Sequence, residues 1–177
     1  GLSDLVELRM KATSPPLREA AARQLLSLCR SYGVPLLIND DVELAFRIAA
    51  DGVHLGQEDC PPERARQLLG PEALIGLTCN DARQLERALQ LPIDYIGLGP
   101  CHYTETKQRL APILGHEGYR RLQLHDYPLP VYAIGGIEPQ EEPELRALGL
   151  YGIAMSRSLL RSTGEAKTPL PHTPTRP

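Results

Sequence analysis

The sequence predicts an α/β fold in which parallel strands and covering helices form a (β/α) barrel. Apolar segments of strand length alternate with segments of helical periodicity along most of the chain, and short connections join them. The strand segments are almost continuously apolar, as expected of a parallel sheet buried on both faces. Seven such strands in a chain of 177 residues favour a barrel over a doubly wound open sheet. No G-x-G-x-x-G motif follows a strand, which excludes the usual dinucleotide-binding fold.

The first half of the chain contains four predicted strands, at residues 5–11, 34–38, 52–56 and 74–77. The first strand alternates apolar and polar residues and ends in basic ones, and Ser14, Pro15 and Pro16 break the chain after it. Predicted helices follow the four strands, at residues 17–32, 42–50, about 62–70 and 82–91. Proline can begin the third of these helices without losing a helical hydrogen bond, and Asp81 is placed to cap the fourth.

The second half of the chain continues the same alternation. A strand at residues 94–98 ends at Gly99 and Pro100, and a helix near residues 116–125 follows it. Further strands are predicted at 130–134 and 152–155, with a helix near 139–148 between them. We therefore predict a barrel domain over residues 1–162. Residues 163–177 are rich in proline and are predicted to be a disordered tail.

Composition excludes several classes of function. The net charge of −3 argues against a nucleic-acid-binding protein, and no apolar run is long enough to span a membrane. No signal peptide opens the sequence, so we expect a cytoplasmic protein. The four cysteines have no C-x-x-C spacing, and they fit reduced thiols better than disulfides or a zinc site.

Polar residues gather at the predicted carboxyl ends of the strands, where a parallel barrel builds its functional site. They include cations, carboxylates, hydroxyls and glycines: Arg9, Lys11, Asn39, Asp40, Gln57, Glu58, Asp59, Thr78, Thr104, Thr106, Lys107, Gly135, Gly136 and Ser156. Basic residues can hold phosphate groups, and two separated carboxylates suit Mg²⁺ together with phosphate oxygens. The pattern predicts a site for a phosphorylated or diphosphorylated ligand that binds Mg²⁺ through Asp40 and Asp59.

Each of these residues also has a purely structural interpretation. Asn39 and Asp40 could cap the helix that follows them, and the acids could form surface ion pairs. His54 lies between two apolar residues of its strand, so its side chain is expected to face into the barrel. There it is either a hydrogen-bonded core histidine or part of the site.

Five segments carry a resemblance to a known family. They are Leu8-Arg-Met-Lys, Ile38-Asn-Asp, Ala50-Asp-Gly-Val-His-Leu-Gly-Gln-Glu-Asp, residues 94–107 with their Thr-x-Thr-Lys motif, and Ala133-Ile-Gly-Gly-Ile. In order and spacing they resemble thiamine phosphate synthase, over about residues 5–160. The resemblance implies a TIM (β/α)8 barrel. It also implies a transferase that condenses hydroxymethylpyrimidine diphosphate with hydroxyethylthiazole phosphate to thiamine phosphate and pyrophosphate.

The resemblance also implies roles for individual residues. It assigns Mg²⁺ to Asp40 and Asp59, and a chemical role to Lys107, Thr78 and His54. The implied substrate-binding residues are Arg9, Lys11, Asn39, Gly56, Thr104, Thr106, Gly135, Gly136 and Ser156. The implied ligands are small molecules, with no nucleic acid and no membrane, and a homo-oligomer is compatible with the sequence. Two alternatives stay open, an isomerase of the thiazole tautomerase type and a non-catalytic barrel that binds thiamine phosphates.

The strand at residues 5–11 resembles the second strand of that family. We therefore expect a TIM barrel that lacks its first β–α unit in this chain, with seven strands and two unpaired edges. The alternative is that the natural protein continues upstream of Gly1.

Overall fold

A computed structural model describes residues 4–103 and 111–156 of the chain. Its centre is one sheet of seven parallel strands that pair in the order in which they occur in the sequence. The strands are β1 (Val6–Leu8), β2 (Leu36–Asn39), β3 (Gly52–Leu55), β4 (Leu74–Cys79), β5 (Tyr95–Leu98), β6 (Val131–Ile134) and β7 (Gly152–Ala154). The predictions of seven strands and of a parallel sheet are confirmed.

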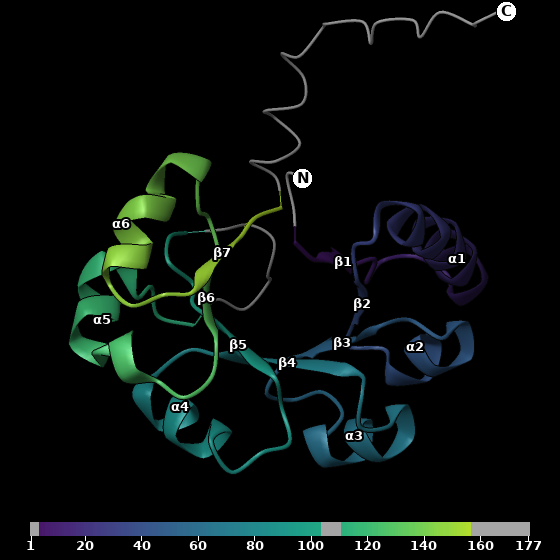
Figure 1. The fold of residues 1–177 in the computed structure, drawn as a ribbon, viewed down its shortest axis with the longest axis horizontal. Helices are drawn as coiled ribbons and strands as arrows, with labels where there is room; N and C mark the ends of the chain where they lie inside the picture. Colours follow the sequence, from purple (N-terminus) through teal and green to yellow (C-terminus); the bar gives the residue numbers. More distant parts are fainter. Residues whose placement is uncertain (1–3, 104–110, 157–177) are drawn as a thin grey trace, which may run out of the picture.

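The sheet curls into an incomplete barrel, and the helices cover its convex side (Figure 1). They are α1 (Pro15–Tyr32), α2 (Val42–Ile48), α3 (Pro62–Leu69), α4 (Ala82–Ala88), α5 (Gly115–Leu122) and α6 (Glu142–Ala147), with 3-10 turns η1 (Leu124–Asp126) and η2 (Pro139–Glu141). Within the described residues, β1 pairs only with β2 and β7 only with β6. Among these residues β1 and β7 are therefore the two unpaired edges of the sheet, as predicted. None of the described helices is long and apolar enough to cross a membrane.

Several boundaries differ from those predicted. Helix α1 begins at Pro15, two residues before the predicted start. Proline is tolerated there because the N–H groups of the first helical turn form no hydrogen bonds within the helix, so the N–H that proline lacks is not needed. The predicted helix at 116–125 ends at Leu122, since Gln123 adopts a left-handed conformation with φ 51°. The predicted helix at 139–148 divides into η2 and α6, and Pro143 lies at the start of α6. Asp81 caps α4 as predicted, accepting a hydrogen bond from the backbone N–H of Gln84 at 2.8 Å.

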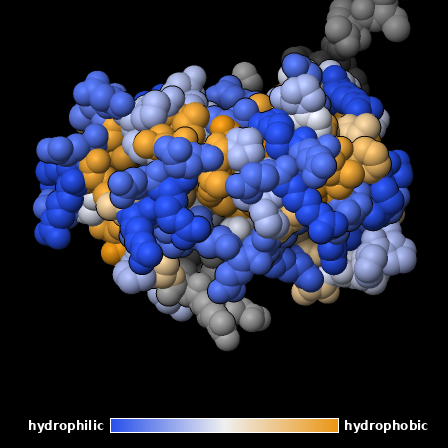
Figure 2. Space-filling view, turned by 90° about the horizontal axis from the view of Figure 1, so that it is seen from below, coloured by the Kyte–Doolittle hydropathy of each residue, from blue (hydrophilic) through white to orange (hydrophobic). Residues whose placement is uncertain are grey.

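The hydrophobic core lies between the sheet and the helices. Strand residues such as Leu36, Ile38 and Ile75 are completely or almost completely buried, as is Tyr119 of α5. The Tyr119 hydroxyl donates a hydrogen bond to the carbonyl of Leu98 at 2.8 Å, which ties α5 to the end of β5. Hydrophilic side chains cover most of the outer face shown in Figure 2, with hydrophobic surface showing between them.

Two acids at the amino ends of strands have structural roles. Asp51 accepts a hydrogen bond from the backbone N–H of Leu36, and Asp94 accepts one from Ile75, at 2.8 and 2.7 Å. Each aspartate thereby fastens its own strand to the start of a neighbouring one. These acids lie at the opposite end of the sheet from the candidate site, so they stabilise the fold rather than bind a ligand.

Candidate active site

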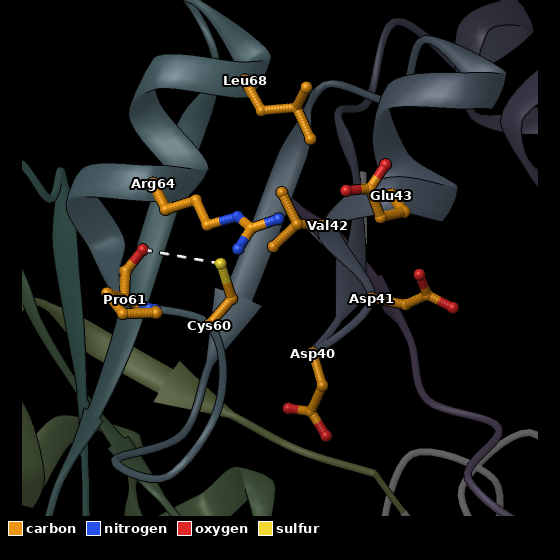
Figure 3. A pocket seen from close by; sticks show the side chains of 8 residues that line it. All are labelled: Asp40, Asp41, Val42, Glu43, Cys60, Pro61, Arg64 and Leu68. Carbon is orange, nitrogen blue, oxygen red and sulfur yellow. Dashed lines mark hydrogen bonds between the residues drawn. The ribbon is translucent and has the colours of Figure 1, made fainter.

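The end of β2 directs Asn39 and Asp40 towards the site. Asp40 has a left-handed backbone conformation, with φ 64°, and its N–H donates to the carbonyl of His54 at 2.9 Å. The next residue, Asp41, caps α2 by accepting the N–H of Leu44 at 2.9 Å. Since Asp41 takes the capping role, the carboxylate of Asp40 is free to point elsewhere. Figure 3 shows the two carboxylates pointing in different directions.

Asp40 is the centre of a charged group formed by the ends of three adjacent strands. The Nζ atom of Lys11, after β1, lies 2.5 Å from Oδ2 of Asp40. The side chain of Asp59, after β3, lies within hydrogen-bonding reach of the Asp40 carboxylate. Asp59 also accepts a hydrogen bond from the backbone N–H of Gly56 at 2.7 Å. The two acids predicted to bind Mg²⁺ are therefore adjacent, although 19 positions separate them in the sequence.

The two carboxyl groups titrate differently. Burial raises the pKa of Asp40, but hydrogen bonds with Asp59 and Lys11 outweigh it and bring the pKa below its ordinary value. Burial, followed by the contact with Asp40, raises the pKa of Asp59. Asp40 is thus the group that holds the negative charge, and Asp59 is the one that keeps a proton more readily.

Asn39 adds an amide to the same group. Its Nδ2 atom is buried and makes no hydrogen bond of normal geometry within the described chain. The amide nevertheless lies close enough to Asp40 to lower the pKa of that carboxyl. A buried donor without a partner is costly, and an anionic ligand at this position would satisfy it.

Two shallow pockets meet at Asp40. One, of about 300 Å³, is lined by Lys11, Arg18, Asn39, Leu8 at the end of β1 and Met10 after it. The other, of about 310 Å³, lies between the starts of α2 and α3 (Figure 3). Its lining residues are Asp40, Asp41, Val42, Glu43, Cys60, Pro61, Arg64 and Leu68. The first pocket is lined by Lys11 and Asn39, two of the residues predicted to bind substrate, and is the better candidate for the site. Arg9, directly after β1, is half-buried.

A second group of polar residues lies within the curled sheet. The Nε2 atom of His54 is 2.9 Å from Oγ1 of Thr78, and its Nδ1 atom is 2.8 Å from the Tyr95 hydroxyl. His54 and Thr78 are 8% and 4% exposed, so this chain of hydrogen bonds is almost closed to solvent. Gly76 and Gly97 make room for these side chains. A Cβ atom at position 76 would lie 2.1 Å from the side chain of Tyr95, and one at position 97 would lie 3.0 Å from the ring of His54. The predicted inward orientation of His54 agrees with these contacts.

A third group lies where β5, β6 and β7 end. Gly135 and Gly136 have φ angles of 89° and 71°, and a Cβ atom at Gly136 would lie 2.8 Å from the carbonyl of Tyr103. The N–H of His102 donates to the carbonyl of Gly135 at 2.9 Å. The glycine pair therefore lets the β6 turn pack against the segment after β5. Ser156 follows β7 and is exposed. Thr104, Thr106 and Lys107 lie outside the described residues.

The structure thus brings the predicted residues together in three groups. The largest joins Lys11, Asn39, Asp40, Gly56 and Asp59 at the ends of β1 to β3, and Arg9 directly follows β1. Sequence reasoning missed two supporting residues. Tyr95 was read only as a strand residue, although its position two residues before Gly97 places both on one face of β5. Asp41 was overlooked because Asp40 offered the same side chain one position earlier.

A curled parallel sheet whose polar residues gather at the carboxyl ends of its strands is the architecture of the α/β-barrel enzymes. Comparison with known proteins narrows this class. A family model described as thiamine monophosphate synthase matches residues 1–159. The chain therefore belongs to the thiamine monophosphate synthase family.

Individual relatives support the same family membership. A thiamine-phosphate synthase of Phocaeicola vulgatus is 42% identical over 172 residues, which cover 95% of this chain and 81% of that protein. One from Bacteroides thetaiotaomicron is 41% identical, with 91% of this chain and 79% of that protein covered. Among solved structures, thiamine phosphate pyrophosphorylase from Pyrococcus furiosus superposes with a TM-score of 0.75 at 30% identity. That match covers 86% of this chain and 72% of the other.

Proposed function

We propose that this chain is a transferase that condenses hydroxymethylpyrimidine diphosphate with hydroxyethylthiazole phosphate. The products are thiamine phosphate and pyrophosphate. The observation that carries the proposal is the contact of Lys11, Asp40 and Asp59 at three adjacent strand ends in a member of this family. A diphosphate leaving group needs both a cation and a site for a divalent metal ion, and this group of residues supplies both.

The donor set at this position fits Mg²⁺. Carboxylate oxygens are ligands that Mg²⁺ prefers, and it commonly uses one or two of them with phosphate oxygens. Asp40 and Asp59 are close enough to share a proton, which a bound dication would displace. In the proposal these two residues hold the ion, which would neutralise charge on the diphosphate oxygens. Dependence of the activity on Mg²⁺ is part of the proposal.

The remaining residues bind and orient the substrates. Arg9, Lys11, Asn39 and Lys107 would hold the diphosphate, and the unsatisfied Nδ2 of Asn39 is suited to donate to a phosphate oxygen. Gly56, His54 and Thr78 would border the pyrimidine, with the hydroxyl of Tyr95 fixing the orientation of the His54 ring. The turn at Gly135 and Gly136, together with Thr104, Thr106 and Ser156, would bind the thiazole phosphate.

The bond changes are simple. The C–O bond between the pyrimidine methylene and the diphosphate breaks, and pyrophosphate leaves with the electron pair. The lone pair of the thiazole nitrogen then forms the new C–N bond to the pyrimidinylmethyl cation. Protein groups contribute by neutralising the leaving group, by excluding water from the cation and by aligning the two rings. We place this activity in the cytoplasm, a location supported by four cysteines that are all free thiols.

The test is an assay that follows pyrophosphate and thiamine phosphate together, with both substrates and Mg²⁺. Formation of both products in equal amounts, and only when both substrates are present, supports the synthase. Isomerisation of the thiazole phosphate alone would identify a tautomerase, and binding without turnover would identify a non-catalytic barrel. Asp40→Asn should abolish most of the activity. Asp126→Asn changes an exposed carboxylate in η1, which precedes β6 at the end of the sheet away from the site, so it is the matched control and should retain the activity.

A further inference from the structure

Four potential metal ligands meet at the ends of β5 and β6, beside the Gly135–Gly136 turn and apart from the charged group at Asp40. They are Cys101 and His102 after β5, His116 in the first turn of α5, and Glu141 in η2. One ligand atom from each residue lies within 4.8 Å of all the others. Cys101 is fully buried, whereas the other three side chains are half-buried. A metal ion could therefore enter from solvent and reach a buried sulfur atom.

The spacing of these atoms is close to that of a tetrahedral centre. Sγ of Cys101 lies 3.5 Å from Nε2 of His102. Oε1 of Glu141 lies 2.6 Å from that same nitrogen and 3.1 Å from Nε2 of His116. Tetrahedral zinc with ordinary bond lengths separates sulfur from nitrogen by about 3.6 Å, and nitrogen from oxygen by about 3.3 Å. Side-chain movements of less than about 1 Å would convert one arrangement into the other.

Surrounding contacts orient the ligands in the manner of a metal centre. The second ring nitrogen of His116, Nδ1, lies 2.8 Å from Oε1 of Glu144. The second carboxylate oxygen of Glu141, Oε2, accepts a hydrogen bond from the backbone N–H of Glu138 at 2.8 Å. A histidine that binds metal through one nitrogen usually donates its other N–H to a carboxylate or carbonyl. Glu144 is placed to provide that partner for His116.

We propose that Cys101, His102, His116 and Glu141 form a structural zinc site. One thiolate, one carboxylate and two neutral imidazoles balance the charge of Zn²⁺, and four protein ligands leave no position open for catalysis. Binding releases the thiol proton of Cys101 and any proton held between the imidazoles and Glu141. The ion would connect the segment after β5 to the turn after β6, where Gly135 and Gly136 lie. The sulfur and nitrogen ligands separate this site from the oxygen-rich group at Asp40.

The same residues could instead form a hydrogen-bonded cluster without metal, in which both histidines donate to Glu141. A titration with Co²⁺, a spectroscopic substitute for zinc, distinguishes the two. The full chain is stripped of metal and titrated in excess Mg²⁺, which occupies the hard oxygen site. The proposal predicts one equivalent of tetrahedral Co²⁺ with a thiolate charge-transfer band, displaced by Zn²⁺. It also predicts that Zn²⁺ raises the melting temperature.

Variants assign the ligands. Cys101→Ser should remove the thiolate band, whereas Cys79→Ser, at a buried cysteine ending β4, should keep it. Glu144→Gln should weaken zinc binding by about 10- to 100-fold. Because the Glu144 side chain is 61% exposed, this change leaves the fold intact and remains informative if Cys101→Ser is unstable. An octahedral spectrum, a thiolate band that survives Cys101→Ser, or Zn²⁺ binding unaffected by Glu144→Gln would overturn the proposal.

Discussion

The Asp40 carboxylate lies 2.5 Å from the ammonium group of Lys11 and also contacts the Asp59 carboxyl group. The three residues follow β1, β2 and β3, so the contact depends on the parallel order of these strands. Two acids in contact are unfavourable in a protein unless a proton, a cation or a metal ion lies between them. In the ligand-free protein, Lys11 and a shared proton provide the positive charge between the two acids. Mg²⁺ bound with the substrate would replace the proton.

Asp40→Asn and Asp59→Asn should each raise the Mg²⁺ concentration needed for half-maximal activity. Because the two carboxyl groups contact each other, their effects should not add. We expect the double variant to lose less activity than the product of the single losses. A Mg²⁺ titration of thiamine phosphate formation measures this, with Asp126→Asn in η1 as the control. Unchanged titrations in both single variants would mean that these acids do not bind the metal.

The same two changes should shift stability in opposite directions in the absence of metal. The pKa of Asp40 is lowered by folding, so its contribution is present above the unfolded pKa and is lost as pH falls through the folded value. The pKa of Asp59 is raised, so its contribution is lost as pH rises through the folded value. At neutral pH Asp59→Asn should therefore stabilise the protein, and Asp40→Asn, which leaves Lys11 unpaired, should destabilise it.

Urea unfolding in EDTA, at neutral pH and near pH 3, tests this expectation. The higher free energy of unfolding of Asp59→Asn should disappear at the lower pH, where the side chain at position 59 is neutral in both proteins. If Asp59→Asn is less stable than the parent at neutral pH, the direction of its pKa shift is wrong.

Sequence reasoning reached the fold because strand order in a barrel follows from alternating periodicity. From the residues alone it left open whether Asp40 caps α2 or belongs to the site, and in the structure Asp41 is the cap. The choice depends on the left-handed conformation of Asp40, which turns one carboxylate towards Lys11 and leaves the next at the helix start. Residue patterns do not encode such a backbone angle at a residue other than glycine.

The cysteines illustrate a second limit. Their spacing argued against a zinc site, because zinc motifs are recognised by pairs of cysteines or histidines close in sequence. In the cluster proposed above, Cys101, His102 and His116 come from the segment after β5 and the start of α5, and Glu141 comes from η2 after β6. Only the packing of α5 and η2 against the end of β5 brings these atoms together, so no local motif could reveal them.

Thr78 offers a test of the interior hydrogen bonds. Thr78→Val keeps the shape but removes the hydroxyl that contacts Nε2 of His54, at a position that is 4% exposed. Loss of one partner from a buried pair should lower the free energy of unfolding by about 1–3 kcal/mol. Activity should fall as well, because the ring of His54 loses one of its fixing contacts. Thr78→Ser retains the hydroxyl and should restore most of both. Equal behaviour of the valine and serine variants would exclude a role for this hydrogen bond.

Arg66 provides the opposite case, a residue whose change should affect stability and not activity. Its guanidinium donates to the carbonyls of Gly70, Pro71, Ala73 and Pro92 and to the carboxylate of Asp94. Asp94 in turn accepts the N–H of Ile75, so this network holds the amino ends of β4 and β5 together. These contacts lie at the end of the sheet away from the site.

Lysine cannot reproduce a planar fork of donors, so Arg66→Lys should lower the free energy of unfolding by about 1–3 kcal/mol. Arg87→Lys, on the exposed face of α4, should leave that free energy unchanged. At 25 °C, where both variants are folded, kcat/KM should stay within about twofold of the parent. A large loss of kcat/KM in a folded Arg66→Lys protein would show that the network also positions the site. That result would contradict the separation between a stabilising end of this barrel and a functional one.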